Sequence, residues 1–154
     1  FKAVALFYDF RELIPIGKLG DEIIRNIIAK MINLDLLDKS IAFLEHQVKY
    51  RFKDEEKIKS GNKLAFLYLV NKEPQKVLEL LKETEEEDFA FKYQDERLVL
   101  QAKALIDLGE ADKAIEILSL EESAEAKDLL AEIYWKEKKW NKIIEILEER
   151  FFTR

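Results

Sequence analysis

The sequence predicts an all-α protein built from repeated pairs of helices, and three observations support this prediction. Strong helix formers such as Leu, Ile, Glu, Lys and Ala fill long windows of the chain. Glycine and proline are scarce, with 4 and 2 copies, whereas sheet proteins of this size need more turn residues. One nine-residue phrase occurs four times, as LLDKSIAFL (36–44), EPQKVLELL (73–81), EADKAIEIL (110–118) and KWNKIIEIL (139–147).

Each phrase contains a lysine followed by a residue that we call the anchor. Stepping back by one repeat from the first anchor predicts another at Ala3, and the chain begins FKAVALF, with Lys2 in front of it. Because a residue at this place points largely outward, we expect each lysine to cover apolar surface with its stem and keep its ammonium group in water. The four anchors, spaced by 37, 37 and 29 residues, are Ser40, Val77, Ala114 and Ile143.

A second segment repeats upstream of each phrase. LAFLY (64–68) and LAEIY (130–134) each end nine residues before their anchor, and QAKAL (101–105) and IIAKM (27–31) occupy the same place. In the phrase itself the anchor, the next residue and the fourth residue after the anchor form an apolar stripe, as in Ala114, Ile115 and Leu118. Two segments per repeat predict two amphipathic helices joined by a short turn.

The repeat divides the chain into a half pair followed by four pairs. Residues 1–14 are expected to form the second helix of a truncated pair. One pair cannot bury its apolar stripe alone, and about three stacked pairs are needed for stability. Glycine and proline interrupt every candidate for a long coiled coil, which needs a sustained heptad pattern. The four full pairs are expected over residues 20–50, 54–84, 90–120 and 122–152.

Turn residues support these boundaries. Gly109 can take the left-handed conformation that commonly ends a helix. Pro74 suits the first position of a helix, where its missing N–H is harmless. Asp21, Asp54 and Ser123 are predicted helix N-caps.

These features resemble the tetratricopeptide repeat, a helix–turn–helix unit with L-G-x-x-Y in its first helix and A-x-x-x-F in its second. LAFLY and LAEIY resemble the first motif with Ala in place of Gly, and Ala114…Leu118 and Ala3…Phe7 resemble the second. The period departs from 34 residues, and the family's opening Trp and terminal Pro are absent. The resemblance implies a right-handed α-α superhelix, a solenoid of stacked antiparallel helix pairs.

The chain also resembles a segment of the long tetratricopeptide-type arrays of uncharacterised bacterial proteins, so we expect the array to continue in a longer chain. In this family the first helices line a concave groove that holds extended peptides or partner helices. Arg25, Asn62 and Lys63 resemble the family's clamp for a terminal carboxylate, although Ala29 stands where that clamp needs Asn. The groove residues that the resemblance implies are Arg25, Asn26, Asn33, Lys59, Asn62, Lys63, Phe66, Lys103, Asp107, Asp128, Glu132 and Trp135.

The function implied by this resemblance is a non-catalytic scaffold that binds a peptide or helix segment of a partner protein. An alternative is an accessory region that positions substrate for a larger enzyme whose catalytic site lies outside the chain. A third possibility is self-association, because both ends are apolar, with Phe1, Phe7, Tyr8 and Phe10 near one and 151–152 near the other.

Sequence patterns for catalysis, metals and cofactors are absent. The chain has no cysteine, which rules out disulfides and thiolate zinc sites and favours a reducing compartment such as the cytoplasm. His46 is the only histidine and has no HExxH context, so it is expected on a helix surface. PIGKLGDE (15–22) lacks the first glycine and the hydroxyl of a phosphate loop and is expected to be a linker. ETEEED (83–88) has no calcium-loop pattern and is expected to be a solvated loop.

Charge and hydropathy argue against two classes of partner. The net charge is −6, divided into +3 over residues 1–77 and −9 over 78–154. A nucleic-acid-binding surface would need a basic stripe with aromatic platforms, so nucleic acid is not an expected partner. No apolar run approaches the roughly 20 residues that cross a bilayer, so no membrane is expected either.

The uneven charge suggests that the groove orients a partner of mixed charge. We expect its acidic part to face Arg25 and Lys63. Exchanging both residues for glutamate should slow association at low salt, because charges at the rim of an interface act mainly on the association rate. An unchanged rate would contradict this orientation.

Overall fold

The computed structural model describes residues 17–33 and 36–152, except the side chains of 18, 19 and 32. The chain divides into two compact units, residues 1–52 and 53–154. Every regular element of the described ranges is helical and none is a strand, which confirms the all-α prediction. The predicted half pair at 1–14, with the anchor Ala3, lies outside these ranges.

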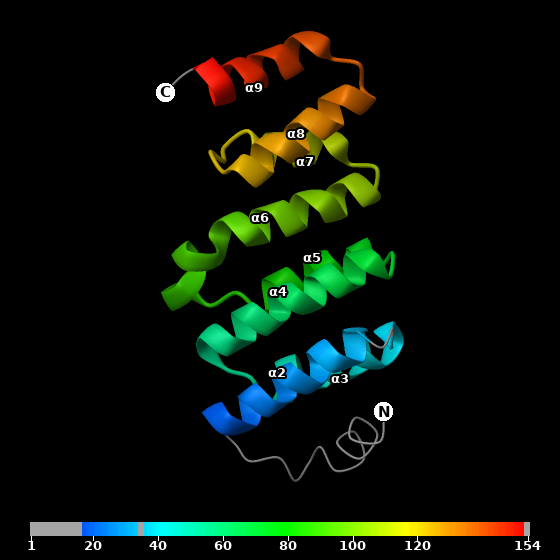
Figure 1. The fold of residues 1–154 in the computed structure, drawn as a ribbon, viewed down its shortest axis with the longest axis vertical. Helices are drawn as coiled ribbons and strands as arrows, with labels where there is room; N and C mark the ends of the chain where they lie inside the picture. Colours follow the sequence, from blue (N-terminus) through cyan, green and yellow to red (C-terminus); the bar gives the residue numbers. More distant parts are fainter. Residues whose placement is uncertain (1–16, 34–35, 153–154) are drawn as a thin grey trace. The chain divides into compact units, whose positions relative to one another are not determined.

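The first unit contains α2 (Lys18–Asn33) packed against α3 (Leu37–Tyr50) (Figure 1). The predicted N-cap at Asp21 is wrong, because α2 already begins at Lys18. Asp21 Oδ1 instead accepts a hydrogen bond of 3.3 Å from Arg51 Nε. The prediction of a linker over 15–22 is therefore also wrong from Lys18 onward. The buried apolar side chains of this unit are Ile24, Ile28, Met31, Ile41, Phe43, Leu44, Val48 and Phe52.

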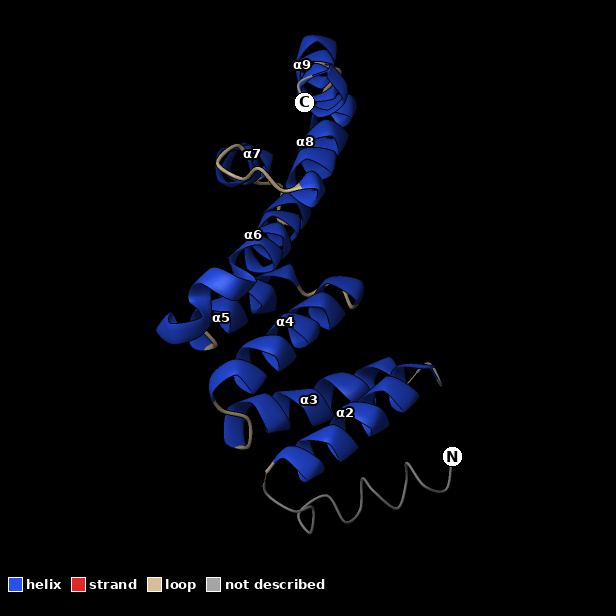
Figure 2. Cartoon of the chain, turned by 60° about the vertical axis from the view of Figure 1, so that its left-hand side comes forward, coloured by secondary structure: helices blue, strands red, loops and turns tan. Residues whose placement is uncertain are grey.

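The second unit contains six α-helices and a short 3-10 helix within its described residues. Each α-helix packs against the next along the chain, and α6 also packs against both α4 and α8. Figure 2 shows α5 and α7 on the same side of the row formed by α4, α6 and α8. The elements are α4 (Asp54–Val70), α5 (Pro74–Glu83), η2 (Glu87–Phe89), α6 (Ala90–Asp107), α7 (Ala111–Leu118), α8 (Ala124–Lys136) and α9 (Trp140–Phe152).

The anchor positions are buried in three of the described helices. Ser40, Val77 and Ala114 each have 0% exposure, as expected for the residue that faces the first helix of its own pair. Ile143 is half-buried. The lysine before each of these four anchors is exposed, as predicted from its outward direction.

One long backbone hydrogen bond recurs at the turn inside each pair, in both units. In this bond, the backbone N–H of the residue four before the anchor donates to the carbonyl of the residue nine before the anchor. In the second unit, the residue just before the donor has a left-handed conformation, and it is Lys72, Gly109 or Lys138. A second bond from that residue's N–H completes a Schellman motif. Gly109, with φ of 79°, confirms its prediction. The four long bonds are Leu36 to Met31 (3.0 Å), and Glu73 to Tyr68, Glu110 to Leu105 and Lys139 to Tyr134 (2.8 Å each).

Lys72→Gly is expected to stabilise the protein. Lys72 has φ of 60°, a conformation that costs a residue with a Cβ about 1–2 kcal/mol. Glycine removes this strain but adds entropy to the unfolded chain, so we expect a net gain of about 0.5–1 kcal/mol. Urea denaturation measures it. Lys82→Gly, in the last turn of α5, is the control and should destabilise, and a loss of stability in both variants would contradict the assigned strain.

Of the other three predictions for helix starts, two are confirmed and one is wrong. Pro74 is the first residue of α5, and Ser123 Oγ accepts a hydrogen bond of 3.3 Å from the Ala126 N–H at the start of α8. Asp54 is not a cap: it is the first residue of α4, and Lys53 occupies the cap position.

Candidate partner-binding clefts

Three of the predicted groove residues belong to the first unit. Arg25, Asn26 and Asn33 are all exposed on α2. Asn26 and Asn33 are seven residues apart, which is close to two helical turns, so they share a face of α2.

In the second unit, three predicted residues line one cleft, which we call the α6–α8 cleft. Lys103 and Asp107 reach it from α6, and Glu132 reaches it from α8. Its volume of about 330 Å³ lies at the small end of the range for binding pockets, roughly 300–1,000 Å³. Five apolar and five charged residues line it: Leu69, Lys103, Ile106, Asp107, Ala111, Leu129, Glu132, Ile133, Lys136 and Glu137.

Charges of both signs surround the apolar part of this cleft. Lys103 and Asp107 are four residues apart on α6, and Glu132 and Lys136 are four residues apart on α8. Side chains at this spacing share one helix face. Each helix therefore presents one positive and one negative group, in opposite order along the two sequences. This pattern suits a segment that carries both charges around an apolar side chain.

The predicted residues of α4 are exposed with one exception. Phe66 is 52% exposed and Val70, one turn further on, is 51% exposed. Lys63 is exposed, and Lys59 Nζ lies 3.9 Å from a carboxylate oxygen of Glu55. The face of α4 is thus more apolar than the matching faces of α6 and α8.

Asn62 is the exception and corrects the groove prediction. It is only 2% exposed, and its amide is bonded inside the unit. The Nδ2 group donates to Glu96 Oε2 at 3.0 Å, and Oδ1 accepts from Arg97 Nη1 at 2.8 Å. Asn62 therefore joins α4 to α6 and does not face a partner, so a clamp that uses its amide is not available.

The remaining predicted residues, Asp128 and Trp135, are exposed on α8 but engaged with α9. Asp128 pairs with Arg150. Trp135 is 64% exposed and makes an edge-to-face contact with Trp140, with ring centroids 5.0 Å apart. Neither of them lines the α6–α8 cleft.

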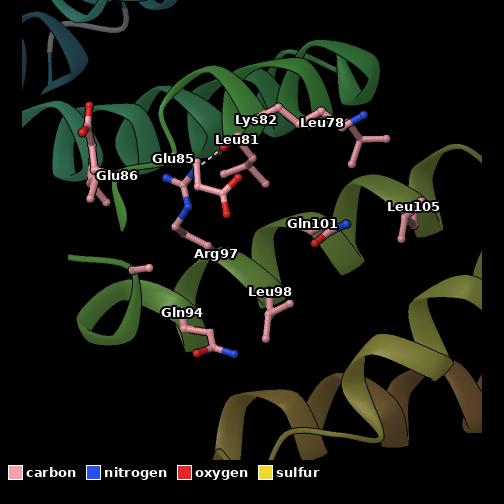
Figure 3. Close-up of a pocket in the computed structure, with 12 residues that line it drawn as sticks. Leu78, Leu81, Lys82, Glu85, Glu86, Gln94, Arg97, Leu98, Gln101 and Leu105 are labelled. Carbon is pink, nitrogen blue, oxygen red and sulfur yellow. Dashed lines mark hydrogen bonds between the residues drawn. The ribbon is translucent and has the colours of Figure 1, made fainter. Parts of the chain in front are cut away.

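A second, larger cleft lies between α5 and α6, with a volume of about 610 Å³ (Figure 3). We call it the α5–α6 cleft. The sequence did not predict this cleft, because no repeated motif marks the segment between α5 and α6. Its lining includes Leu78, Leu81 and Leu98 with Gln94, Arg97 and Gln101.

Arg97 is the central polar residue of the α5–α6 cleft. It donates hydrogen bonds to the Leu81 carbonyl, to Thr84 Oγ1 at 3.1 Å and to Asn62 Oδ1 at 2.8 Å. Burial lowers the pKa of its guanidinium group, and the charges of Glu85 and Glu96 oppose this shift. Arg97 joins α4, α5 and α6 through these three hydrogen bonds, and all three acceptors are neutral.

A smaller cluster joins the start of α4 to the start of α6. Glu55 Oε1 accepts from Lys92 Nζ at 2.5 Å and from the Tyr93 hydroxyl at 2.6 Å. These hydrogen bonds, with Lys92 first, lower the pKa of Glu55 to about 2. The same contacts raise the pKa of Lys92.

The Glu55 cluster predicts a dependence of stability on acid. Because the folded pKa is lowered, its contribution is fully present above the ordinary value of 4.5 and is lost as the pH falls from there to about 2. Thermal melts of wild type and Glu55→Gln over this window should therefore converge as the pH falls. Solvent screens these exposed groups. A gap between the two melting curves that stays constant with pH would contradict the assignment.

Other sequence interpretations concern metals and histidine. Within the described ranges, no group of three or more His, Asp or Glu side chains could hold a metal ion. His46 is exposed on α3, with its ring 5.0 Å from that of Tyr50, as expected for a surface histidine. None of the described helices is long and apolar enough to cross a bilayer.

Comparison with known proteins adds no identification. No family model, curated protein or solved structure matches the chain. A function is therefore proposed from its own residues.

Proposed function

We propose that the chain is a non-catalytic scaffold that binds a peptide segment of a partner protein along the exposed face of its first helices. We also propose that its helix pairs form a tetratricopeptide-like solenoid. The three Schellman turns of the second unit and the buried anchors support the second proposal, because turns of one kind favour the same antiparallel packing in the pairs that contain them.

The observation that carries the function is the arrangement of the α6–α8 cleft. Leu69, Ile106, Leu129 and Ile133 supply apolar surface, which is where binding free energy originates. Polar groups around it fix the orientation of a ligand and make binding specific. A site with these parts needs no catalytic group.

The charges favour a peptide as the occupant. Within the described part of the chain, Lys103, Asp107, Glu132 and Lys136 form no ion pair with any residue. Their charged groups are therefore available to a ligand. A peptide with one apolar side chain between an acidic and a basic residue would complement the cleft. An exposed apolar extension at Phe66 and Val70 would contact further residues of the same segment.

A charge exchange within the cleft tests this function. Peptides are first selected against the wild-type chain from a random library displayed on phage. The double variant Lys103→Glu with Glu132→Lys keeps the net charge but reverses the sign at two places. We expect the selected peptides to associate about tenfold more slowly at low salt, and this difference to shrink as salt is added.

A matched exchange on α7 is the control. Lys113→Glu with Glu116→Lys changes two exposed side chains outside the cleft and should leave peptide association unchanged. Equal effects of the two exchanges, or no selectable peptide at all, would contradict the proposal.

A further inference from the structure

The exposed faces of α4, α6 and α8 carry two rows of residues at equivalent places of the repeat. Successive members of each row are separated by 37 and then 29 residues, like the anchors. The first residue row is Phe66, Lys103 and Glu132, and the second, one helical turn further on, is Val70, Asp107 and Lys136. All six side chains are exposed. Figure 1 shows the three helices running in the same direction, so each residue row crosses them.

The order of charge reverses between the two rows. The first residue row reads apolar, positive, negative, and the second reads apolar, negative, positive. A ligand that lies along the α6–α8 cleft, parallel to its helices, would meet one positive and one negative group at each end and gain little from charge. A ligand that crosses the helices along one row meets a defined order of charge. The reversal therefore favours a ligand that crosses them.

The distance between the helices sets the spacing of the ligand's side chains. Helix α6 packs directly against α4 and α8, and directly packed helices lie about 8–10 Å apart. In the polyproline II conformation every third side chain points the same way, at intervals of ~9 Å. An α-helical ligand would need about six residues to cover this distance, and residues six apart in a helix lie on different faces. An extended peptide therefore fits the rows better than a helix.

The first residue row has the larger apolar anchor. Phe66 and Val70 are about equally exposed, at 52% and 51%, but an aromatic ring offers more apolar area to a ligand than a valine side chain. Leu69, which lies between them in sequence, lines the α6–α8 cleft, so α4 also reaches this cleft.

We propose that the ligand is an extended peptide whose apolar, acidic and basic side chains, three residues apart and in that order, contact Phe66, Lys103 and Glu132. The inference rests on the proposed peptide-binding function and adds the sequence that the site selects. A further apolar residue, between the acidic and the basic one, would then lie over the α6–α8 cleft. The order can be counted from either end of the peptide.

Peptide selection with two charge exchanges tests this order. Peptides are selected from a random library on phage against wild type, against Lys103→Glu with Glu132→Lys, and against Asp107→Lys with Lys136→Asp. Both exchanges keep the net charge and alter only residues that line the cleft. In wild-type selections, the charged residue three positions from the apolar one should be acidic. The first exchange should make it basic, and the second, as the matched control, should leave it acidic.

Synthetic peptides measure the size of the preference. A selected peptide is compared with a second one in which its acidic and basic residues have changed places. Wild type should bind the selected order about tenfold more tightly, and the first exchange should reverse this preference. Circular dichroism checks that both variants keep their helices, and the order among wild-type selections needs no variant.

The outcomes separate this inference from the function on which it rests. Selected peptides with no fixed order of charge, with a helical spacing, or with an order that follows the second exchange would overturn the inference while leaving peptide binding intact. A library that yields no binder would overturn both.

Discussion

Arg97→Met is expected to destabilise the protein by about 2–3 kcal/mol. Methionine preserves the apolar stem but removes every donor, so the Leu81 carbonyl, Thr84 Oγ1 and Asn62 Oδ1 each lose a hydrogen bond. Thr84 and Asn62 are only 1% and 2% exposed, and water cannot readily replace the lost donor there. Urea denaturation followed by circular dichroism measures the change in the free energy of unfolding.

Two further variants separate the hydrogen-bond network from the charge. Arg97→Lys keeps the charge but cannot reach three acceptors at once, so its loss should approach that of methionine. Arg150→Met removes an arginine from the surface pair with Asp128 and should cost less than about 1 kcal/mol. An Arg97→Met chain as stable as Arg150→Met would show that the network contributes little.

Gly61→Ala is expected to destabilise the protein by about 1–3 kcal/mol, although alanine in a helix is ordinarily better than glycine by about 0.5–1 kcal/mol. A Cβ on Gly61 would lie 2.9 Å from Thr84 Oγ1 and 3.0 Å from Thr84 Cγ2. Thr84 cannot turn away freely, because its hydroxyl donates to the Leu80 carbonyl at 2.8 Å and accepts from Arg97. Thermal and urea denaturation both report the loss.

Thr84→Ala supplies the control for this contact. It removes both atoms that the new methyl group would meet most closely, so Gly61→Ala should cost less in the Thr84→Ala background than in wild type. A double-mutant cycle gives the coupling free energy. If Gly61→Ala instead stabilises the wild-type chain, the close approach of α4 to Thr84 is incorrect.

The sequence predicted the helix class and the pair turns where a residue type has one dominant physical reason. Gly109 could be assigned to a left-handed turn because glycine lacks a Cβ, and the anchors could be assigned to the interior because their register repeats. Lys72 and Lys138 adopt the same left-handed conformation without a compositional signal. Their turns follow from the register alone, so the residue types could not reveal the strain.

The candidate site was predicted only in part, because orientation around a helix depends on what packs beside it. Lys103, Asp107 and Glu132 line one cleft, but Asn62 turns inward. Val99, at the same place in the next pair, is also only 5% exposed, whereas Arg25 and Asp128, at that place in the first and last pairs, are exposed. The Arg97 network escaped prediction since it depends on the path of the chain between α5 and α6.

Amide chemical-shift mapping of the isotope-labelled chain with a phage-selected peptide tests the central claim most directly. We expect the largest shifts on the exposed face of the first helices, around Phe66, Lys103, Asp107 and Glu132, with α5 and the part of α7 after Ala111 little changed. Shifts confined to α5, α7 or α9 would contradict peptide binding by the first helices.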